Sequence, residues 1–414
     1  MLGRQRTTGK ILKGMRILDF TALLPGPYAT QILADLGAEV IRVESPKRVD
    51  LARFTPPMVT NEISATHAQI NRNKSSISLD LKNEDARSIV YDLVKPETGF
   101  DIVLEGFRPG VMDRLGLGYN DLLKKNREII YCSLTGYGQD GPLKDKAGHD
   151  INFLALSGLS SYGGGDEPSL SAMQIADIAG GSHHAVIGIL AAVIQRMNQR
   201  TIMSDSTDVL GQHIDVSMSD CAFALNAMYG ASSLYSGNNP ERGAEMLTGK
   251  LATYNYYKAK CGRHISVGAL EPRFAEIFFD TIGHKGWTQR NASDNTLVDD
   301  VAAVIAKKSL KEWEKVFDGK DCCVEPVLNL QEAIDHPRTK ARGLVQNTPS
   351  ADGISEFSHI TQLALPIKFC NSQMESYRTG GKIGSESEQI LKEILNMTDE
   401  EIKTLRRNGT VPDT

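Results

Sequence analysis

Residues 15–44 read MRILDFTALLPGPYATQILADLGAEVIRVE, and the fold class follows from the pattern in this stretch. The segments "MRILDF" and "AEVIRVE" are short apolar runs, typical of buried strands. Between them, apolar residues recur at helical spacing over residues 28–36, and Gly37 follows as a stop signal. The stretch therefore predicts a strand, a helix and a second strand in one βαβ unit.

The same alternation continues along the first half of the chain. Further strand-like segments are "SSISLDL" (75–81), "DIVLEGF" (101–107), "EIIYCSL" (128–134) and "HIDVSMS" (213–219), with a helical pattern over residues 86–94. Strands that alternate with helices favour a parallel sheet covered by helices on both faces. We expect an α/β fold of the doubly wound, Rossmann-like kind.

Length and composition suggest more than one domain. A chain of 414 residues exceeds the usual size of a single domain. The composition shifts to Gly, Ser and Asn around residues 230–249, as expected where a chain crosses into a smaller domain. The C-terminal part returns to a strand-like run, "LALPIKF". We expect domain boundaries at 1–229, 230–330 and 331–414.

Several protein classes do not fit the chain. The net charge of -5 argues against a nucleic-acid-binding protein. The most apolar run, near residues 185–194, looks too short to span a membrane. Six cysteines without a CxxC pair are typical of reduced thiols. The basic N-terminus fits a solvated arm or a weak organellar presequence, so we expect a cytoplasmic protein, with mitochondrial or peroxisomal location as alternatives.

Common catalytic and cofactor motifs are missing. Only Gly26 separates the first strand from its helix, so the dinucleotide fingerprint is absent although Glu44 ends the second strand. "GLSSYG" does not match a serine nucleophile elbow, and no Walker loop is present. His183 and His184 are adjacent and would point to different sides of a helix, so no metal site is expected.

Three potential proton carriers lie in glycine-flanked turns: His149 in "AGHDINF", Asp177 in "IADIAGG" and Glu271 in "GALEPRF". Each has a simple structural explanation on its own, as a loop histidine, a helix N-cap and a turn residue. Their spacing alone does not show that they meet.

Basic residues lie at the predicted strand ends, and in a doubly wound sheet ligands bind at the carboxyl ends of the strands. They are Arg42, Arg72, Lys74, Arg108 and Arg114. Arginine side chains can bind phosphate oxygens in a bidentate manner, but scattered solvated charges would give the same pattern.

At these residues the sequence resembles the family III coenzyme A transferase superfamily and, within it, the α-methylacyl-CoA racemase branch. The resemblance covers "ILDFTALLPGPYATQILADLGAEVIRVE", "NRNKSSISLDLK", "EGFRPGVMDRLGLGY", "YCSLTGYGQDGP", "AGHDINFLALSG" and "GALEPRF". It implies a large Rossmann-like domain whose parallel sheet is built from both chain ends, and a small inserted α+β domain. It also implies an interlocked homodimer.

The resemblance implies that His149 and Asp177 are the catalytic pair and that Glu271 supports them. In the family, the histidine takes the α-proton of the (S)-thioester and the aspartate that of the (R)-thioester. Inversion at a carbon beside a thioester needs two such groups on opposite faces. The backbone N–H of Asp150 would then donate to the developing enolate oxygen.

The resemblance also implies a binding site for the coenzyme A part of the substrate, with no separate cofactor. Its predicted residues are Arg42, Asn71, Arg72, Lys74, Gly106, Phe107, Arg108, Arg114, Gly148, Asp150, Ile151, Asn152 and Phe153. Their basic members would contact the phosphates, and the segments "GFR" and "GHDINF" would line the pantetheine path.

The expected activity is epimerisation of 2-methyl-branched acyl-CoA thioesters by 1,1-proton transfer through an enolate. The alternative is a CoA-transferase in which Asp177 attacks the acyl-CoA as a nucleophile. A third interpretation is an acyl-CoA-binding protein without catalysis. The expected partner is the acyl-CoA substrate, with no nucleic acid and no membrane.

Overall fold

The computed structural model describes residues 10–202, 209–290, 294, 296–351, 358–372 and 377–412. The chain divides into two compact units. Unit 1 comprises Met1–Ser157, Ala172–Leu225 and Gly343–Thr414, and unit 2 comprises Gly158–Ser171 and Asn226–Arg342. Residues 158–171 and 331–342 thus group with unit 2, outside the 230–330 range expected for the small domain.

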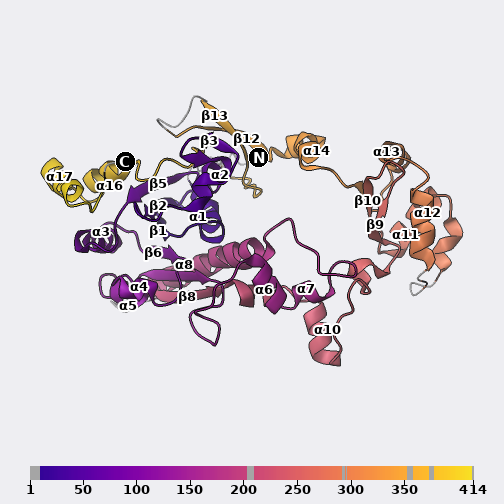
Figure 1. Ribbon diagram of the computed structural model, residues 1–414, viewed down its shortest axis with the longest axis horizontal. Coiled ribbons are helices and arrows are strands. Elements are labelled where there is room, and N and C mark those ends of the chain that lie inside the picture. Colours follow the sequence, from indigo (N-terminus) through magenta and orange to yellow (C-terminus); the bar gives the residue numbers. More distant parts are fainter. Residues whose placement is uncertain are drawn as a thin grey trace. The chain divides into compact units, whose positions relative to one another are not determined.

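A six-stranded sheet forms the centre of unit 1, and all of its strands are parallel (Figure 1). Its order is β5-β2-β1-β6-β7-β8. The strands are β1 (Arg16–Phe20), β2 (Glu39–Glu44), β5 (Lys74–Ser78), β6 (Ile102–Glu105), β7 (Ile130–Thr135) and β8 (Gln212–Ser217). β6 and β7 are buried along their whole length, as expected for strands covered on both faces. The predicted α/β class with a parallel sheet is confirmed.

Helices cover this sheet, and two short hairpins flank it. The helical elements of unit 1 are α1 (Pro25–Asp35), η1 (Leu51–Phe54), α2 (Ala65–Ile70), α3 (Glu84–Val94), α4 (Val111–Arg114), α5 (Tyr119–Leu123), α6 (Asp150–Leu156), η2 (Ile175–Ser182), α8 (His183–Ile202), α9 (Met218–Ala224), α16 (Ser387–Glu393) and α17 (Asp399–Arg407). The hairpins pair β3 (Met58–Thr60) with β4 (Ile63–Ser64), and β12 (Val345–Pro349) with β13 (His359–Leu363). α1 begins earlier than predicted because Pro25, which suits a first helical position, opens it.

The C-terminal segment joins unit 1 through side chains and helices rather than through a strand of the main sheet. The backbone N–H of Ser76, on the outer strand β5, donates to Glu386 Oε2 at 2.7 Å, and that of Ser78 donates to Ser387 Oγ at 3.1 Å. Figure 1 shows α16 next to β5. The expectation of a sheet built from both chain ends is therefore wrong, because every strand of the sheet comes from residues 16–217.

The predicted strand "LALPIKF" is also mostly irregular. β13 ends at Leu363, at the first residue of that run, and the following residues are not in a ladder. Pro366 explains the ending, since proline has no backbone N–H to donate.

η2 and α8 form one helical segment, Ile175–Ile202, that packs on β7 and β8. Gly181 permits the close approach, because a Cβ there would lie 2.9 Å from Met218 and 3.1 Å from Leu134. At 28 residues this segment is long and apolar enough to cross a membrane by length and composition. The expectation that no run reaches that length is therefore wrong. Core helices pass the same test, and this segment contacts the sheet.

Unit 2 has an antiparallel sheet of order β11-β10-β9, formed by β9 (Tyr254–Lys258), β10 (His264–Gly268) and β11 (Val324–Pro326). Its helical elements are α7 (Leu159–Tyr162), α10 (Tyr229–Ser236), η3 (Met246–Lys250), α11 (Pro272–Thr281), η4 (Lys285–Gln289), α12 (Thr296–Ile305), α13 (Leu310–Phe317), α14 (Leu330–Asp335) and α15 (Pro337–Arg342). Phe278 and Trp313 are buried in its core, and Trp313 Nε1 donates to the Ile305 carbonyl at 2.7 Å.

Candidate active site

The strand order places a topological switch point between β1 and β6. From β1 the chain builds outward through β2 and β5, and from β6 it builds the other way through β7 and β8. Ligands of open parallel sheets bind at the carboxyl ends of the strands beside such a point. Gly26, the second residue of α1, must be glycine, because a Cβ would lie 2.3 Å from the Thr21 side chain. The turn after β6 carries Gly106, Phe107 and Arg108.

His149 and Asp177 belong to the same unit and lie on two elements that contact each other, α6 and η2. His149 is the residue before α6, and its backbone N–H donates to Asn152 Oδ1 at 3.0 Å. Asp150 links the two elements, because its Oδ1 accepts the backbone N–H groups of Ala176 at 2.7 Å and Asp177 at 3.0 Å. The structure therefore brings the predicted histidine and aspartate segments together.

Asp177 lies in the first turn of the π-helical segment η2, a rare geometry that is frequent at functional sites. Asp177 as a whole residue is half-buried. Burial and then the charge of Asp150 raise the pKa of Asp177 to about 6, and the charge of His149 acts in the opposite direction. A carboxyl group that titrates near neutral pH can both accept and donate a proton.

Glu271, the third predicted proton carrier, belongs to unit 2. It is exposed and immediately precedes α11, with Pro272 at the first helical position. Burial and then the charge of Glu271 raise the pKa of the Cys323 thiol, so these two residues share one part of unit 2. Its predicted support of the catalytic pair stays a prediction.

The exposed members of the predicted coenzyme A site lie after β6 and at the start of α6. Arg108 and Arg114 are exposed, and the turn and helix α4 that carry them directly follow β6. Gly106, Ile151 and Asn152 are exposed, and Phe107 and Gly148 are half-buried. All of these residues belong to unit 1.

Phe153, another predicted coenzyme A contact, is buried and packs beneath the residues at the start of α6. Its ring is buried and packs edge-on against Tyr137, with ring centres 5.1 Å apart. A Cβ at Gly136 or Gly148 would lie 2.7 Å from the same ring. These glycines therefore give the ring its space, and Phe153 holds the turn that leads to His149.

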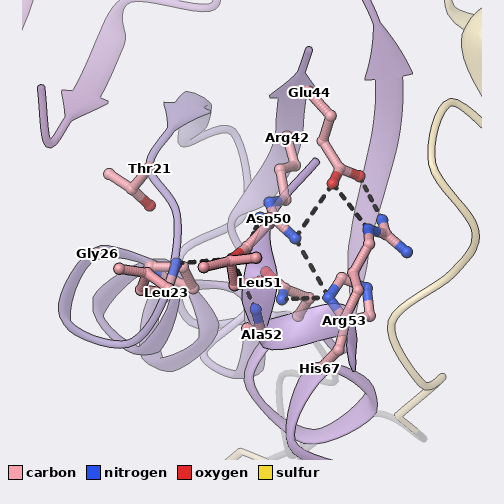
Figure 2. A network of polar contacts seen from close by, with 12 residues as sticks. Thr21, Leu23, Gly26, Arg42, Glu44, Asp50, Leu51, Ala52, Arg53 and His67 are labelled. Carbon is pink, nitrogen blue, oxygen red and sulfur yellow. Dashed lines mark hydrogen bonds and ion pairs between the residues drawn. The ribbon is translucent and has the colours of Figure 1, made fainter. Parts of the chain in front are cut away.

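Four other predicted binding residues, Arg42, Asn71, Arg72 and Lys74, are buried. Figure 2 shows the Arg42 side chain between Asp50 and Glu44. Arg42 forms an ion pair with Asp50 and lies 3.4 Å from a Glu44 oxygen. Glu44 in turn pairs with Arg53 at 2.6 Å. Asp50 Oδ1 also accepts the backbone N–H of Leu23, so this network holds the turn after β1.

The remaining three follow the same pattern. The Arg72 guanidinium binds Asp35, with an Nη2–Oδ2 distance of 2.6 Å, and Lys74 Nζ lies 3.1 Å from Asp19 Oδ2 and 2.9 Å from Asn71 Oδ1. Burial lowers the pKa of Lys74 to about 8. Arg42, Asn71, Arg72 and Lys74 are thus buried and have partners inside the protein. The proposed phosphate contacts do not include them.

Glu105 is a buried acidic residue that the sequence analysis missed, because it reads as part of a strand. It ends β6, and its Oε2 accepts the backbone N–H of Phe107 at 2.8 Å. Burial raises the pKa of Glu105 to about 7, against a hydrogen bond from Ser133. Glu105 therefore fixes the turn that carries Arg108. In the sequence, the position of Glu105 directly before "GFR" was the feature that could have indicated this role.

The described residues contain no group of three or more His, Cys, Asp or Glu side chains suited to a metal ion. The two adjacent histidines at the start of α8 have packing contacts. His184 Nδ1 lies 2.7 Å from the Gly180 carbonyl, and the His183 ring packs near Tyr28.

The parallel sheet, its switch point and the contact between the segments of His149 and Asp177 define an α/β protein with a candidate ligand site at the carboxyl ends of its strands. Residues 12–386 match the family model for CoA-transferase family III, and the chain belongs to this family. A chain of known structure, a CAIB/BAIF family protein from Brucella suis, is 26% identical and superposes with a TM-score of 0.77. The superposition covers 92% of this chain and 99% of that one.

Relatives with two different activities are similar to the chain. The alpha-methylacyl-CoA racemase of Homo sapiens is 32% identical over 410 residues, covering 97% of both chains. The succinyl-CoA:glutarate CoA-transferase of Homo sapiens is 30% identical over 417 residues, covering 97% of this chain and 90% of the relative. Family membership is therefore established, and the two activities remain to be distinguished by the site.

Proposed function

We propose that the protein epimerises the α-carbon of 2-methyl-branched acyl-CoA thioesters, with His149 and Asp177 as the acid–base pair. The observation that carries this proposal is the link between their two segments, through the hydrogen bonds that the backbone N–H groups of residues 176 and 177 donate to the Asp150 carboxylate. The similarity to the human racemase supports the same reaction.

The proposed reaction consists of two proton transfers. One group of the pair removes the α-proton as the C–H bond breaks, and the electron pair moves into the carbon–carbon bond and onto the thioester oxygen. The other group then protonates the opposite face of the enolate. In our proposal His149 accepts the proton of the (S)-thioester and Asp177 that of the (R)-thioester. A group serves in both directions when its pKa lies near the working pH, and that of Asp177 is raised to about 6.

The enolate needs a hydrogen-bond donor, because charge develops on its oxygen during the first transfer. We propose the backbone N–H of Asp150, the first residue of α6, for this role. General acid–base catalysis contributes about 10²–10⁴-fold, so this donor and substrate positioning must supply much of the remaining acceleration.

The coenzyme A part arrives with the substrate, so the proposal needs no resident cofactor. Arg108 and Arg114, both exposed after β6, are the proposed phosphate contacts. Gly106, Phe107 and Gly148 would line the pantetheine path. Glu271 is the proposed supporting acid.

A CoA-transferase reaction is the second candidate, and the similarity to the human succinyl-CoA:glutarate transferase favours it. In that reaction the Asp177 carboxylate attacks the thioester carbonyl, the C–S bond breaks and the CoA thiolate leaves, so that an aspartyl anhydride forms. The thiolate then attacks the aspartyl carbonyl and releases the first carboxylate. The acceptor acid repeats these steps in reverse.

Incubation of each enantiopure 2-methylacyl-CoA in deuterated water distinguishes the two candidates. We expect loss of optical purity together with α-deuterium uptake, without any added carboxylic acid. Turnover that requires an acceptor acid and leaves the α-carbon unexchanged would instead establish the transferase.

Replacement of the histidine sharpens this distinction. We expect His149→Ala to reduce exchange from the (S)-thioester by about 10²-fold or more, because it removes the base. Binding of CoA, measured by calorimetry, should change by less than about threefold. Equal losses in exchange and in CoA binding would show that the histidine has a structural role.

A further inference from the structure

We propose that the side chain of Asp150 is a positioning residue for Asp177, holding the first turn of η2 through two backbone N–H groups and placing a second negative charge beside the catalytic carboxyl group. This inference rests on the proposed function, in which Asp177 transfers a proton. It assigns a role to the Asp150 carboxylate that is separate from that of its backbone N–H.

The geometry of the η2 start carries the inference. The first N–H groups of a helix have no partner within the helix and need an acceptor from elsewhere. Gln174, the residue before η2, provides no side-chain hydrogen bond to this turn. Asp150 Oδ1 instead accepts the N–H groups of Ala176 at 2.7 Å and Asp177 at 3.0 Å. One oxygen atom from helix α6 therefore fixes the backbone of Asp177, the residue that carries the catalytic carboxyl group.

The same contact couples the two members of the proposed pair. Asp150 follows His149 directly and begins α6, so a movement of α6 displaces the imidazole and the cap of η2 together. The described elements α6 and η2 also pack against each other. The hydrogen bonds between Asp150 and the start of η2 therefore help to fix the separation of His149 and Asp177.

The carboxylate also acts on Asp177 electrostatically. Besides burial, the groups that change the pKa of Asp177 are Asp150, which raises it, and His149, which lowers it. Other elements packed against η2 are α1, α8, α9 and β8. Their titratable side chains include Tyr28, His183, Asp220, Cys221 and Asp215. A negative charge beside a carboxyl group favours its protonated form, which Asp177 needs when it donates.

Two substitutions separate the roles of the cap and the charge. Asp150→Asn keeps an oxygen acceptor for both N–H groups but removes the charge, and Asp150→Ala removes both. Both variants keep the backbone N–H of residue 150. Asp145→Asn, at an exposed position of the preceding loop, is the matched control for loss of one negative charge.

For Asp150→Asn we expect the acidic limb of the pH profile for exchange from the (R)-thioester to move down by about one pH unit. For Asp150→Ala we expect kcat to fall about tenfold or more, with KM within about threefold. Asp145→Asn should change neither the pH limb nor kcat.

A direct titration makes the test independent of turnover. The Asp177 carboxyl carbon is observed by ¹³C NMR in protein labelled at aspartate and assigned by its loss in Asp177→Asn. We expect its midpoint to fall by about one pH unit in Asp150→Asn. An unchanged midpoint would overturn the inference. Absence of α-proton exchange in the wild type would overturn the proposed function, while the titration still decides the role of Asp150.

Discussion

Two groups of charged residues in unit 1 differ in how their charges are compensated. In the network of Arg42, Glu44, Asp50 and Arg53, buried acids and bases alternate, and each carboxylate has a basic partner. In the α6–η2 site, Asp150 and Asp177 are both acidic, and Asp150 binds backbone N–H groups instead of a base. In the first arrangement opposite charges compensate each other inside the fold, while in the second burial and a like charge raise the pKa of a carboxyl group. The two groups therefore differ in whether each acid has a basic partner, and not in whether they contain charged residues.

The strongest test of this difference removes the Asp177 charge. Asp177→Asn should reduce α-proton exchange by about 10³-fold or more, because the amide cannot accept the α-proton. The free energy of unfolding at pH 7 should rise by about 1 kcal/mol, after allowance for solvent screening. The sign follows from the raised pKa, because a folded state that binds the proton more tightly than the unfolded state is destabilised above that pKa. Activity assays and denaturant unfolding measure both effects.

Loss of a charge from the network should have the opposite effect on stability. Arg42→Ala leaves the buried Asp50 and Glu44 with less compensation, which should cost about 3–5 kcal/mol in the free energy of unfolding. Arg108→Ala, which removes an exposed guanidinium, is the control and should change stability by less than about 0.5 kcal/mol. Equal effects of the two substitutions would contradict the comparison.

The pH dependence of the wild-type enzyme tests the raised pKa itself. Asp177 must be ionised to accept the proton of the (R)-thioester, so kcat/KM should fall about tenfold per pH unit below a limb near the raised value of about 6. A limb near pH 4, the usual range of an exposed aspartate, would show that burial and Asp150 do not act as described. Exchange rates measured across the acidic range decide this.

The smallest effect is expected at the proposed phosphate contacts. Arg108→Ala should raise the KM for acyl-CoA about tenfold and leave kcat unchanged, since the lost ionic hydrogen bond acts only in binding. With an acyl-pantetheine thioester, which lacks the nucleotide, the substitution should have no effect. A similar rise in KM for both substrates would place the role of Arg108 elsewhere.

The sequence predicted the sheet well, because its evidence is local. The apolar runs at 15–20 and 101–107 and the helical pattern at 86–94 all appear as β1, β6 and α3, within a few residues. The strand predicted at 363–369 did not form beyond Leu363, because Pro366 has no backbone N–H to donate to a neighbouring strand. The helical segment Ile175–Ile202 is longer than the apolar run near residues 185–194, because the residues that interrupt this run stay helical.

Site prediction was uneven for a different physical reason. His149 and Asp177 stood out as titratable groups beside glycines, and their segments do meet. Arg42, Arg72 and Lys74 were interpreted as phosphate contacts, because a basic residue at a strand end looks the same in a sequence whether it is exposed or paired. Their carboxylate partners lie up to 55 positions away along the chain, as Asp19 does from Lys74, so pairing is visible only in three dimensions.

The space reserved for the Phe153 ring has a consequence for how the chain tolerates change. Gly136 and Gly148 can neither bind a ligand through a side chain nor transfer a proton, yet any larger residue at either position would displace the aromatic ring beneath the turn that carries His149. In a saturation library scored for turnover, these two positions should therefore rank beside the acid–base pair in intolerance. Positions ranked by loss of turnover would then include Gly136 and Gly148, which take no part in the proton transfer.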